Sequence, residues 1–584
     1  MQGVLIIVIL VVIAAVGIYA TMPPAGPGPT PPPATTSTTG SVSTSVSTSG
    51  GIPPNTLIIG EVGLTWGANP IGTDITMMWP TASSWPVPVY EQLFQFDPAQ
   101  MKNGEYELVP WLAESATASA DGTTWTISLR QGVRFHTGNV MTATDVQYSL
   151  NRFIFFNDYP LSVTTYPGYG LGYRASFASF KNVSVVSPYQ IKVTLNYPDA
   201  TFLQELASPG ASIVDMNVLE SHAVRTSNSS DHGFAWFNAG QDMGTGPFML
   251  TSFTLQQRAE LTKYTQYWGG IYNTNTPIQK IIFIPIADAT TGRFALESGQ
   301  INILDNAGGQ VVNAISQTGR FNILTTPGFG RIGLYFHPAG PLADWRVRQA
   351  IKFAIDYNGL ISAFTYGYDI PNQSQFYKGM PGWQESAATY YSSKAPDITQ
   401  AKALLAEAGY PNGFSTDIFV LPNPVYGVNA KDWATVIQSD LAKVGINLKV
   451  NVVSTDAYVA MAVNLTQTGM LLVPSSLVIF SPQSNFDQTL GSGNTAFIGW
   501  NAASEKGPNI DFTYLYQTWN KSKTETNPTL QIQEMQTVDE YILKYGCLTP
   551  IVQIGTKVAY ATNIQGLVWN SVNASIDTTY VTIS

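Results

Sequence analysis

Short segments in which apolar and polar residues alternate dominate the first part of the chain after residue 61. Thr123–Arg130 (TTWTISLR) has apolar residues at every second position, and Tyr189–Tyr197 (YQIKVTLNY) repeats the pattern. Successive side chains of a strand point to opposite faces of its sheet, so each segment predicts a strand with one buried face. This region is therefore predicted to contain antiparallel sheet.

Helical periodicity interrupts these strands. Thr142 followed by Asp145 predicts a capping box that opens a helix. Asp344–Leu360 (DWRVRQAIKFAIDYNGL) carries apolar residues three and four apart and predicts one continuous helix. Asp397–Gly409 (DITQAKALLAEAG) predicts another, beginning at an aspartate cap and ending at glycine.

Strands and helices alternate in the second half of the chain. A helix expected around Trp433–Val444 is followed by Ile446–Val453 (INLKVNVV), which alternates like a strand. No self-similar period of about 20 to 50 residues is visible, which disfavours a solenoid or a propeller. The pattern predicts an α/β fold.

The first sixty residues differ from the rest, because no Asp, Glu, Lys or Arg precedes Glu61. Val4–Ala20 is an almost unbroken apolar run, which fits either a membrane anchor or a cleavable signal peptide. Gly3 before this run also resembles pilin-type signals, which leave the apolar run on the mature protein. Residues 21–54 are rich in Pro, Ser and Thr and predict a solvated linker.

Composition narrows the classes of partner. Only 11% of residues are charged and the net charge is -10, so a polyanion such as DNA would be repelled and nucleic-acid binding is not expected. Cys547 is the single cysteine, so no intrachain disulfide can form. A surface wetted mostly by neutral polar groups suits an extracellular protein.

Three stretches resemble the family-5 extracellular solute-binding proteins of ABC importers, the oligopeptide- and dipeptide-binding class, and particularly its archaeal membrane-tethered members. These stretches are Tyr90–Pro98 with Leu108–Arg152 (PWLAES, DGTTW, LRQGVRFH, TATDV), Met243–Leu250 (MGTGPFML) with Tyr267–Gly270 and Leu296–Asn302, and Pro341–Asp356 with Gln400–Phe414. They span most of the chain after Glu61, in the order the family has them.

The resemblance implies a two-lobe periplasmic-binding-protein-like fold with an extra inserted subdomain. Two crossing strands, expected near Pro327–Tyr335 and Thr549–Gly555, would join the lobes. The limits that it suggests are 1–20 for the signal or anchor, 21–54 for the linker, 55–328 for lobe I with an insertion at about 86–231, 329–550 for lobe II, and 551–584 for a return to lobe I.

Several motifs have a simpler explanation than catalysis or cofactor binding. Residues 328–333 match the dinucleotide pattern G-x-G-x-x-G, but a strand follows where a helix is needed, so we interpret Gly328, Gly330 and Gly333 as hinge residues. His136, His222, His232 and His337 are scattered, and a packing role is expected for His136. No metal site, no cofactor and no catalytic residue is predicted, and ATP hydrolysis belongs to a separate subunit.

The ligand is left open between peptide and oligosaccharide, with a slight preference for sugar. Peptide-binding members carry an aspartate for the peptide ammonium, but the corresponding stretch, Leu477–Leu490, has Ile479 or Phe480 at that place, with Asp487 as a possible substitute. Aromatic residues in Gly/Pro-rich surroundings are candidates for stacking on the ligand. The predicted substrate-binding residues are Trp66, Trp383, Phe480, Phe486, Asp487 and Trp500.

The sequence thus predicts an extracellular, monomeric substrate-binding subunit that delivers solute to the permease subunits of an ABC transporter, and not an enzyme. It would sit on the outer face of the cytoplasmic membrane through its N-terminal segment, or be secreted if that segment is cleaved. Six Asn-x-Ser/Thr sequons would suit a glycoprotein: Asn182, Asn228, Asn372, Asn464, Asn520 and Asn573. A surface-layer or adhesion protein built on the same fold is the alternative.

Overall fold

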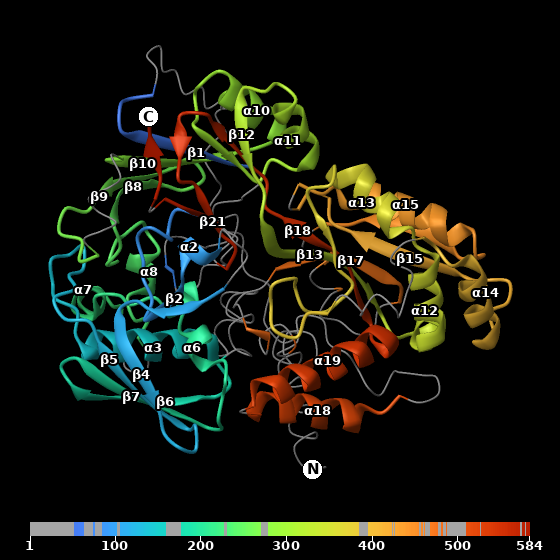
Figure 1. The fold of residues 1–584 in the computed structure, drawn as a ribbon, viewed down its shortest axis with the longest axis horizontal. Coiled ribbons are helices and arrows are strands. Elements are labelled where there is room, and N and C mark those ends of the chain that lie inside the picture. Colours follow the sequence, from blue (N-terminus) through green and yellow to red (C-terminus); the bar gives the residue numbers. More distant parts are fainter. Residues whose placement is uncertain are drawn as a thin grey trace, which may run out of the picture. The chain divides into compact units, whose positions relative to one another are not determined.

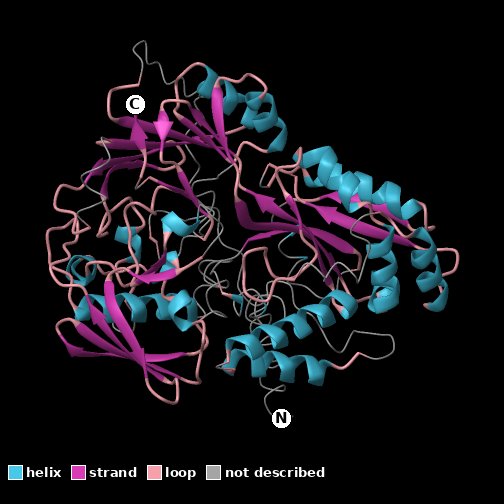
Figure 2. Ribbon diagram, in the orientation of Figure 1, coloured by secondary structure: helices cyan, strands magenta, loops and turns pink. Residues whose placement is uncertain are grey.

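Two large sheets with helices on their faces organise the chain (Figures 1 and 2). The structure is a computed structural model that describes residues 52–62, 74–75, 84–101, 106–158, 177–226, 230–269, 278–384, 395–422, 424–425, 427–454, 457–458, 461, 468–476, 481–482, 486, 510–525, 527–572, 575–578 and 580–584. These residues belong to the unit Thr48–Ser584. The predicted anchor (1–20) and nearly all of the predicted linker (21–54) lie outside them and stay predictions.

The first-lobe sheet has seven strands and mixes parallel and antiparallel pairs. In spatial order these are β12 (Phe321–Leu324), β19 (Val558–Ala561), β11 (Ile303–Asp305), β1 (Thr56–Val62), β10 (Lys280–Ile286), β9 (Arg258–Lys263) and β8 (Phe248–Thr254). All seven residues of β1 are buried, as expected for a central strand covered on both faces. One face carries α10 (Ala289–Glu297) and α11 (Gly309–Ser316).

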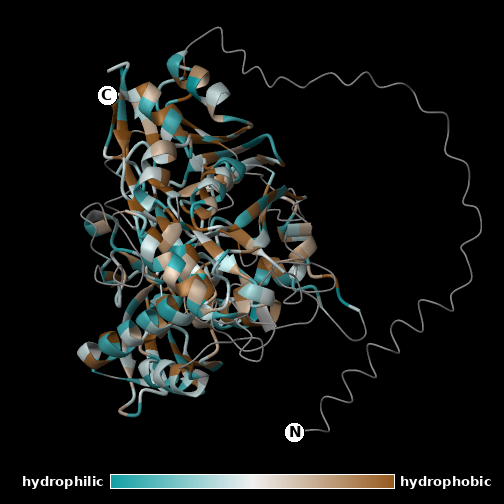
Figure 3. Cartoon of the chain, turned by 90° about the vertical axis from the view of Figure 1, so that its right-hand side faces the viewer, coloured by the Kyte–Doolittle hydropathy of each residue, from teal (hydrophilic) through white to brown (hydrophobic). Residues whose placement is uncertain are grey.

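The second-lobe sheet has six strands. They are β14 (Ile370–Pro371), β18 (Leu548–Gly555), β13 (Pro327–Phe336), β17 (Met470–Ser476), β15 (Ser415–Val420) and β16 (Asn447–Val452). One face packs against α12 (Trp345–Ala354), α13 (Tyr357–Thr365), α14 (Ile398–Glu407) and α15 (Ala430–Ala442). The helices carry hydrophobic and hydrophilic residues side by side, as amphipathic helices do (Figure 3). Two further helices follow, α18 (Phe512–Thr524) and α19 (Pro528–Tyr545).

A four-stranded antiparallel sheet forms the inserted subdomain. Its order is β4 (Ala113–Ala118), β5 (Thr124–Leu129), β7 (Gln190–Leu195) and β6 (Phe180–Ser187), and α3 (Ala143–Asp158) packs against it. The strands predicted at 123–130 and 189–197 are confirmed as β5 and β7. The Asp145 carboxylate accepts the Thr142 backbone N–H at 2.9 Å, which is one half of the predicted capping box.

Shorter elements complete the chain. Three two-stranded ribbons pair β2 (Phe94–Phe96) with β3 (Leu108–Pro110), β20 (Ile564–Gln565) with β23 (Thr582–Ile583), and β21 (Val568–Asn570) with β22 (Ser575–Asp577). The remaining helical turns are α2 (Pro98–Met101), α6 (Phe202–Glu205), η1 (Pro209–Ala211), α7 (Met216–Ser221), α8 (Phe234–Phe237) and η2 (Gly340–Ala343).

The single helix predicted over Asp344–Leu360 is wrong, because the chain forms two helices there. Ile355 is extended, with ψ near 132°, and Asp356 starts α13 by accepting the Gly359 backbone N–H at 2.9 Å. The Asp440 carboxylate of α15 accepts the Asp356 backbone N–H at 3.0 Å. This long-range bond and the new cap replace the helical hydrogen bonds, which the periodicity could not reveal.

An antiparallel pair of chain segments runs from one large sheet into the other. In the first-lobe sheet β12 pairs with β19, with Leu324 opposite Val558, and in the second-lobe sheet β13 pairs with β18, with Pro327 opposite Gly555. Between them the Thr556 backbone N–H donates to Thr326 O at 2.8 Å. We call these four strands the ribbon. The crossing strands expected near 327–335 and 549–555 are β13 and β18, whereas the predicted lobe limits stay predictions.

Two histidines differ in the hydrogen bonds that their rings make. His136 is nearly buried, with Nδ1 2.8 Å from the Asp242 carboxylate and Nε2 2.8 Å from Gly246 O, so it bonds within the first lobe and matches the expected packing role. His337, directly after β13, is 0% exposed, and neither ring nitrogen has a hydrogen-bond partner among the described residues. Burial lowers the pKa of His337 to about 4.

We therefore predict that acid destabilises the protein partly through His337. The unfolded chain binds a proton there near pH 6.5, but the folded chain does so only near pH 4, so this contribution to stability is present above 6.5 and is lost as the pH falls toward 4. His337→Phe should reduce the loss of unfolding free energy between these pH values by on the order of 2 kcal/mol. Chemical denaturation across this range measures it, and equal pH slopes for both proteins would contradict the prediction.

Candidate functional site

The two faces of the ribbon pack against different hydrophobic clusters. Along β13, Ile332, Leu334 and Phe336 pack with the buried residues of α12–α15, because alternate side chains of a strand point to opposite faces. Phe329 and Tyr335 pack in a separate hydrophobic cluster that also contains first-lobe residues. We call the side of Phe329 the front face, and on it the lobes meet.

The segment 372–384 covers the front face of the second-lobe sheet and is held by a buried carboxylate. Asp539 of α19 is 0% exposed and accepts the Ser374 hydroxyl at 2.6 Å and the Gln375 backbone N–H at 2.8 Å. Arg331 of β13 donates to Gln375 O at 2.9 Å. Burial raises the pKa of Asp539 to about 7, although the hydrogen bonds that it accepts oppose the rise. The segment is thereby fixed to both α19 and β13.

Gln553 of β18 also holds the segment 372–384 in place through hydrogen bonds. Its Oε1 accepts the Lys378 backbone N–H at 2.7 Å, and its Nε2 donates to Gly328 O at 2.8 Å. Asn372, which is 4% exposed, donates from Nδ2 to Phe376 O at 2.8 Å. The buried amide of Gln553 thus connects the segment with β13 and β18, and the amide of Asn372 closes a turn within the segment.

Trp383 and Lys378 reach solvent from this fixed segment. The Trp383 indole N–H donates to Asn372 Oδ1 at 3.3 Å, and the Lys378 ammonium lies 5.5 Å from the centroid of the Trp383 ring. Trp383 is half-buried and Lys378 is exposed. An indole face can stack on a planar or sugar ring, and an ammonium can pair with a carboxylate. Such a pair can bind a solute without any reactive group.

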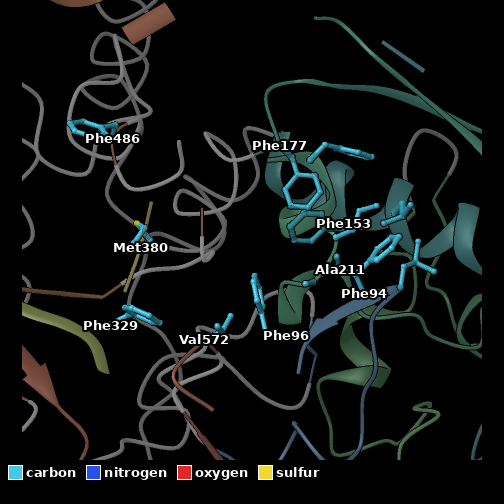
Figure 4. Close-up of a cluster of buried hydrophobic side chains, with 14 of the residues drawn as sticks. Phe94, Phe96, Phe153, Phe177, Ala211, Phe329, Met380, Phe486 and Val572 are labelled. Carbon is cyan, nitrogen blue, oxygen red and sulfur yellow. The ribbon is translucent and has the colours of Figure 1, made fainter. Parts of the chain in front are cut away.

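The first lobe meets the segment through Tyr106. The Tyr106 ring centroid is 5.2 Å from that of Phe329, and a Cβ placed on Gly379 would lie 2.9 Å from Cε2 of Tyr106. Gly379 has a φ of +98°, so both its conformation and this contact favour glycine. Burial raises the pKa of Tyr106. Figure 4 shows Phe96 and Val572 between Phe329 and the first-lobe group around Phe153.

A second buried carboxylate joins the motif stretches of the first lobe. Glu91 accepts hydrogen bonds from Trp111 Nε1 (2.7 Å), Thr245 Oγ1 (2.7 Å), Tyr267 OH (2.7 Å) and Trp268 Nε1 (2.9 Å). Burial raises the pKa of Glu91, while these donors oppose the rise. Trp111 and Trp268 pack against the same hydrophobic cluster as Trp383. The four donors give these residues of the motif stretches a structural role, because they satisfy a carboxylate that is buried.

Two of the six predicted substrate-binding residues lie in the described part of the chain. Trp383 packs against the hydrophobic cluster that contains Phe329, Tyr335 and first-lobe residues. Phe486 is 0% exposed and packs between Phe376 and Trp519, with ring centroids 4.5 and 4.7 Å away, so its ring supports the segment from within. The other four lie outside the described residues and stay predictions: Trp66, Phe480, Asp487 and Trp500.

The three predicted hinge glycines all lie in β13. Gly330 and Gly333 pair with β17 and β18, and a Cβ on Gly333 would lie 3.0 Å from Thr549 O. Gly328 lies beside the junction of the sheets, and its Cβ would be 2.6 Å from Ile554 O. Close approach of β18 therefore accounts for glycine at 328 and 333. Their role in bending stays a prediction.

Sequence reasoning missed Tyr106, Lys378 and Asp539. Glycines at 379 and 382, both with positive φ, mark the turn that presents Lys378 and Trp383, and this signal was readable from the sequence. The contacts with Tyr106 and Asp539 join residues far apart in the chain, so no local pattern shows them.

Two features are absent from the described residues. They contain no group of three or more His, Cys, Asp or Glu side chains arranged to hold a metal ion. None of their helices is both long enough and apolar enough to cross a bilayer.

Known proteins resemble this chain in sequence and in fold. Heme-binding protein A of Haemophilus influenzae is 29% identical over 380 residues, which are 61% of this chain and 63% of that protein. The dipeptide-binding protein of Escherichia coli is 27% identical over 423 residues, covering 69% and 73%. The crystal structure of a Pseudoalteromonas dipeptide binding protein in complex with Met-Leu superposes with a TM-score of 0.71 at 19% identity, covering 91% of this chain and all of that one.

The chain spans somewhat less than two thirds of the heme-binding relative, while the structural match is with the fold of a whole binding protein. The sequence profile of the bacterial extracellular solute-binding proteins, family 5, matches residues 107–497, which is well over half of the 584 residues. This protein therefore belongs to the family-5 extracellular solute-binding proteins, a family of binding proteins and not of enzymes.

Proposed function

We propose that this protein is the substrate-binding subunit of an ABC-type importer, which captures an oligopeptide or an oligosaccharide outside the cell and delivers it to the permease subunits. The observation that carries the proposal is the ribbon, which joins two lobes whose front faces meet around Tyr106 and Gly379. A solute held between lobes can draw them together, and closure is a signal that a permease can read. Tethering through residues 1–20 and a monomeric state belong to the proposal.

The class of solute rests on two opposing arguments. The relatives reported above are named for dipeptide and heme, which favours peptide or another small organic molecule. The stretch in which an acidic anchor for a peptide ammonium is predicted to be missing, 477–490, is described only at 481–482 and 486, so that prediction stands untested. The half-buried aromatic face of Trp383 suits a sugar ring, whereas the Lys378 ammonium suits a carboxylate. Binding experiments with peptides and with oligosaccharides decide between the two classes of ligand.

We expect ligand to close the lobes. Because Cys547 is the single cysteine and is buried, spin labels can be placed at Val186→Cys in β6 and Thr529→Cys in α19, both exposed positions. Pulsed EPR on the full chain should show a shorter distance between labels when one of a set of di- to pentapeptides or di- to pentasaccharides saturates it. An unchanged distance at saturation would favour the adhesion alternative.

Trp383→Ala should weaken binding by about 1–3 kcal/mol, because it removes a stacking face at the inter-lobe surface. Trp345→Ala is the matched control, since Trp345 also has a lysine over its ring, Lys544 at 6.0 Å, but packs against Tyr545 in the second lobe. Calorimetric titration should show a loss of affinity for Trp383→Ala alone. A lower melting temperature with unchanged affinity would assign Trp383 to packing.

Affinity should change little when the ionic strength is raised, because stacking and neutral hydrogen bonds are scarcely screened by salt. Lys378→Gln should then have little effect on binding as well. Titrations at about 0.05 and 0.5 M salt compare both proteins. A large, salt-dependent loss on Lys378→Gln would show instead that the solute carries a negative group paired with this lysine.

A further inference from the structure

The lobes also meet on the opposite side of the ribbon, which we call the back face. There the first-lobe sheet packs against α10 and α11 through buried residues such as Leu304 of β11 and Val312 of α11. The second-lobe sheet packs against α12–α15 through buried residues such as Leu334 of β13 and Leu360 of α13. Tyr368, which follows α13 in the second lobe, packs against the first-lobe cluster. Helices α11 and α13 contact each other directly, and Figure 1 shows them as neighbours.

Four residues form the back contact, and they meet through backbone atoms. A Cβ placed on Gly309, the first residue of α11, would lie 2.6 Å from Thr365 O at the end of α13. A Cβ placed on Gly427 would lie 2.5 Å from Cα of Gly308. Gly308 and Gly427 have φ values of +74° and +71°, which further favours glycine at both positions. No side chain separates the lobes at these points.

The junction between the sheets is pinned on the second-lobe side. Lys557, which lies between β18 and β19, forms a buried ion pair with Asp369 and donates to Gly555 O at 2.8 Å. The Gly555 backbone N–H donates to Asp369 Oδ1 at 2.8 Å. Residues 325–326 and 556–557 link the strands of the two sheets, and the ion pair of Lys557 fixes the second of these links to the second lobe.

We propose that the back contact limits how far the lobes stand open without ligand and thereby sets the affinity for solute. When two bodies rotate about an axis between two contacts, separation at the back brings the front faces together. Backbone atoms that touch cannot yield as flexible side chains do, so added volume there must move the lobes. The consequence for affinity rests on the proposed function, whereas the effect on lobe position does not.

Gly309→Ala tests the first half of the contact. It adds one methyl group against Thr365 O, while Gln310→Ala, at the exposed next position of the same helix, adds nothing there. With the labels at 186 and 529 and no ligand, Gly309→Ala should shift the distance distribution toward the closed value, and Gln310→Ala should leave it unchanged. Affinity for any probe that binds the parent protein should rise on the order of threefold to tenfold, as the closed form becomes more populated.

Gly427→Ala tests the other half and serves if Gly309→Ala fails to fold. Its control is Gly367→Ala, because Gly367 has a similar φ of +80° but no atom within 4 Å of an added Cβ. Both variants carry the same backbone strain, but only Gly427→Ala adds volume to the back contact. The label distance should shorten in Gly427→Ala relative to Gly367→Ala.

The results separate the two proposals. Shorter distances without ligand support the back contact even if no peptide or saccharide probe binds, a result that would count against the proposed function alone. Distances equal to those of the controls, with Gly309→Ala only raising the melting temperature as alanine does in a helix, would overturn the inference. Longer distances in either variant would overturn it too.

Discussion

The ribbon is the constraint on which the rest of the structure depends. Because β12 and β19 pair in one sheet and continue as β13 and β18 in the other, a change in the register of either pair would displace a whole lobe. The two large sheets therefore share their alignment through backbone hydrogen bonds and not through surface side chains. The positions of the helices on the back face and of the loops on the front face depend on this alignment.

Buried polar groups then convert that alignment into a defined surface. Asp539 and Gln553 hold the segment 372–384 against the second-lobe sheet, and Glu91 holds four stretches of the first lobe together. Each would be costly to bury without its partners, so each strongly favours one arrangement of the loops around it. The aromatic residues that border the lobe interface are thus positioned by acids and amides that solvent does not reach.

Local patterns predicted much of the fold, and long-range contacts account for most of what they missed. The strands at β5 and β7 and the helix α14 follow from alternation, caps and a terminal glycine. The break before Asp356 depends on Asp440, 84 residues away, and therefore escaped the helical period. At the candidate site, Trp383 was predicted from its Gly/Pro-rich surroundings, but Tyr106 and Asp539 were not. Their roles depend on which segments the ribbon brings together.

The burial of Asn372 has a consequence for the order of events during export. The sequon Asn372-Gln373-Ser374 is a possible acceptor for a glycan in the unfolded chain, yet in the folded protein Asn372 is 4% exposed and its amide is bonded to Phe376 O. A glycan added at this position before folding would have no space beneath the segment. Modification of Asn372 and completion of the fold therefore exclude each other, and in any host that glycosylates such sequons the folding rate decides which fraction of molecules matures.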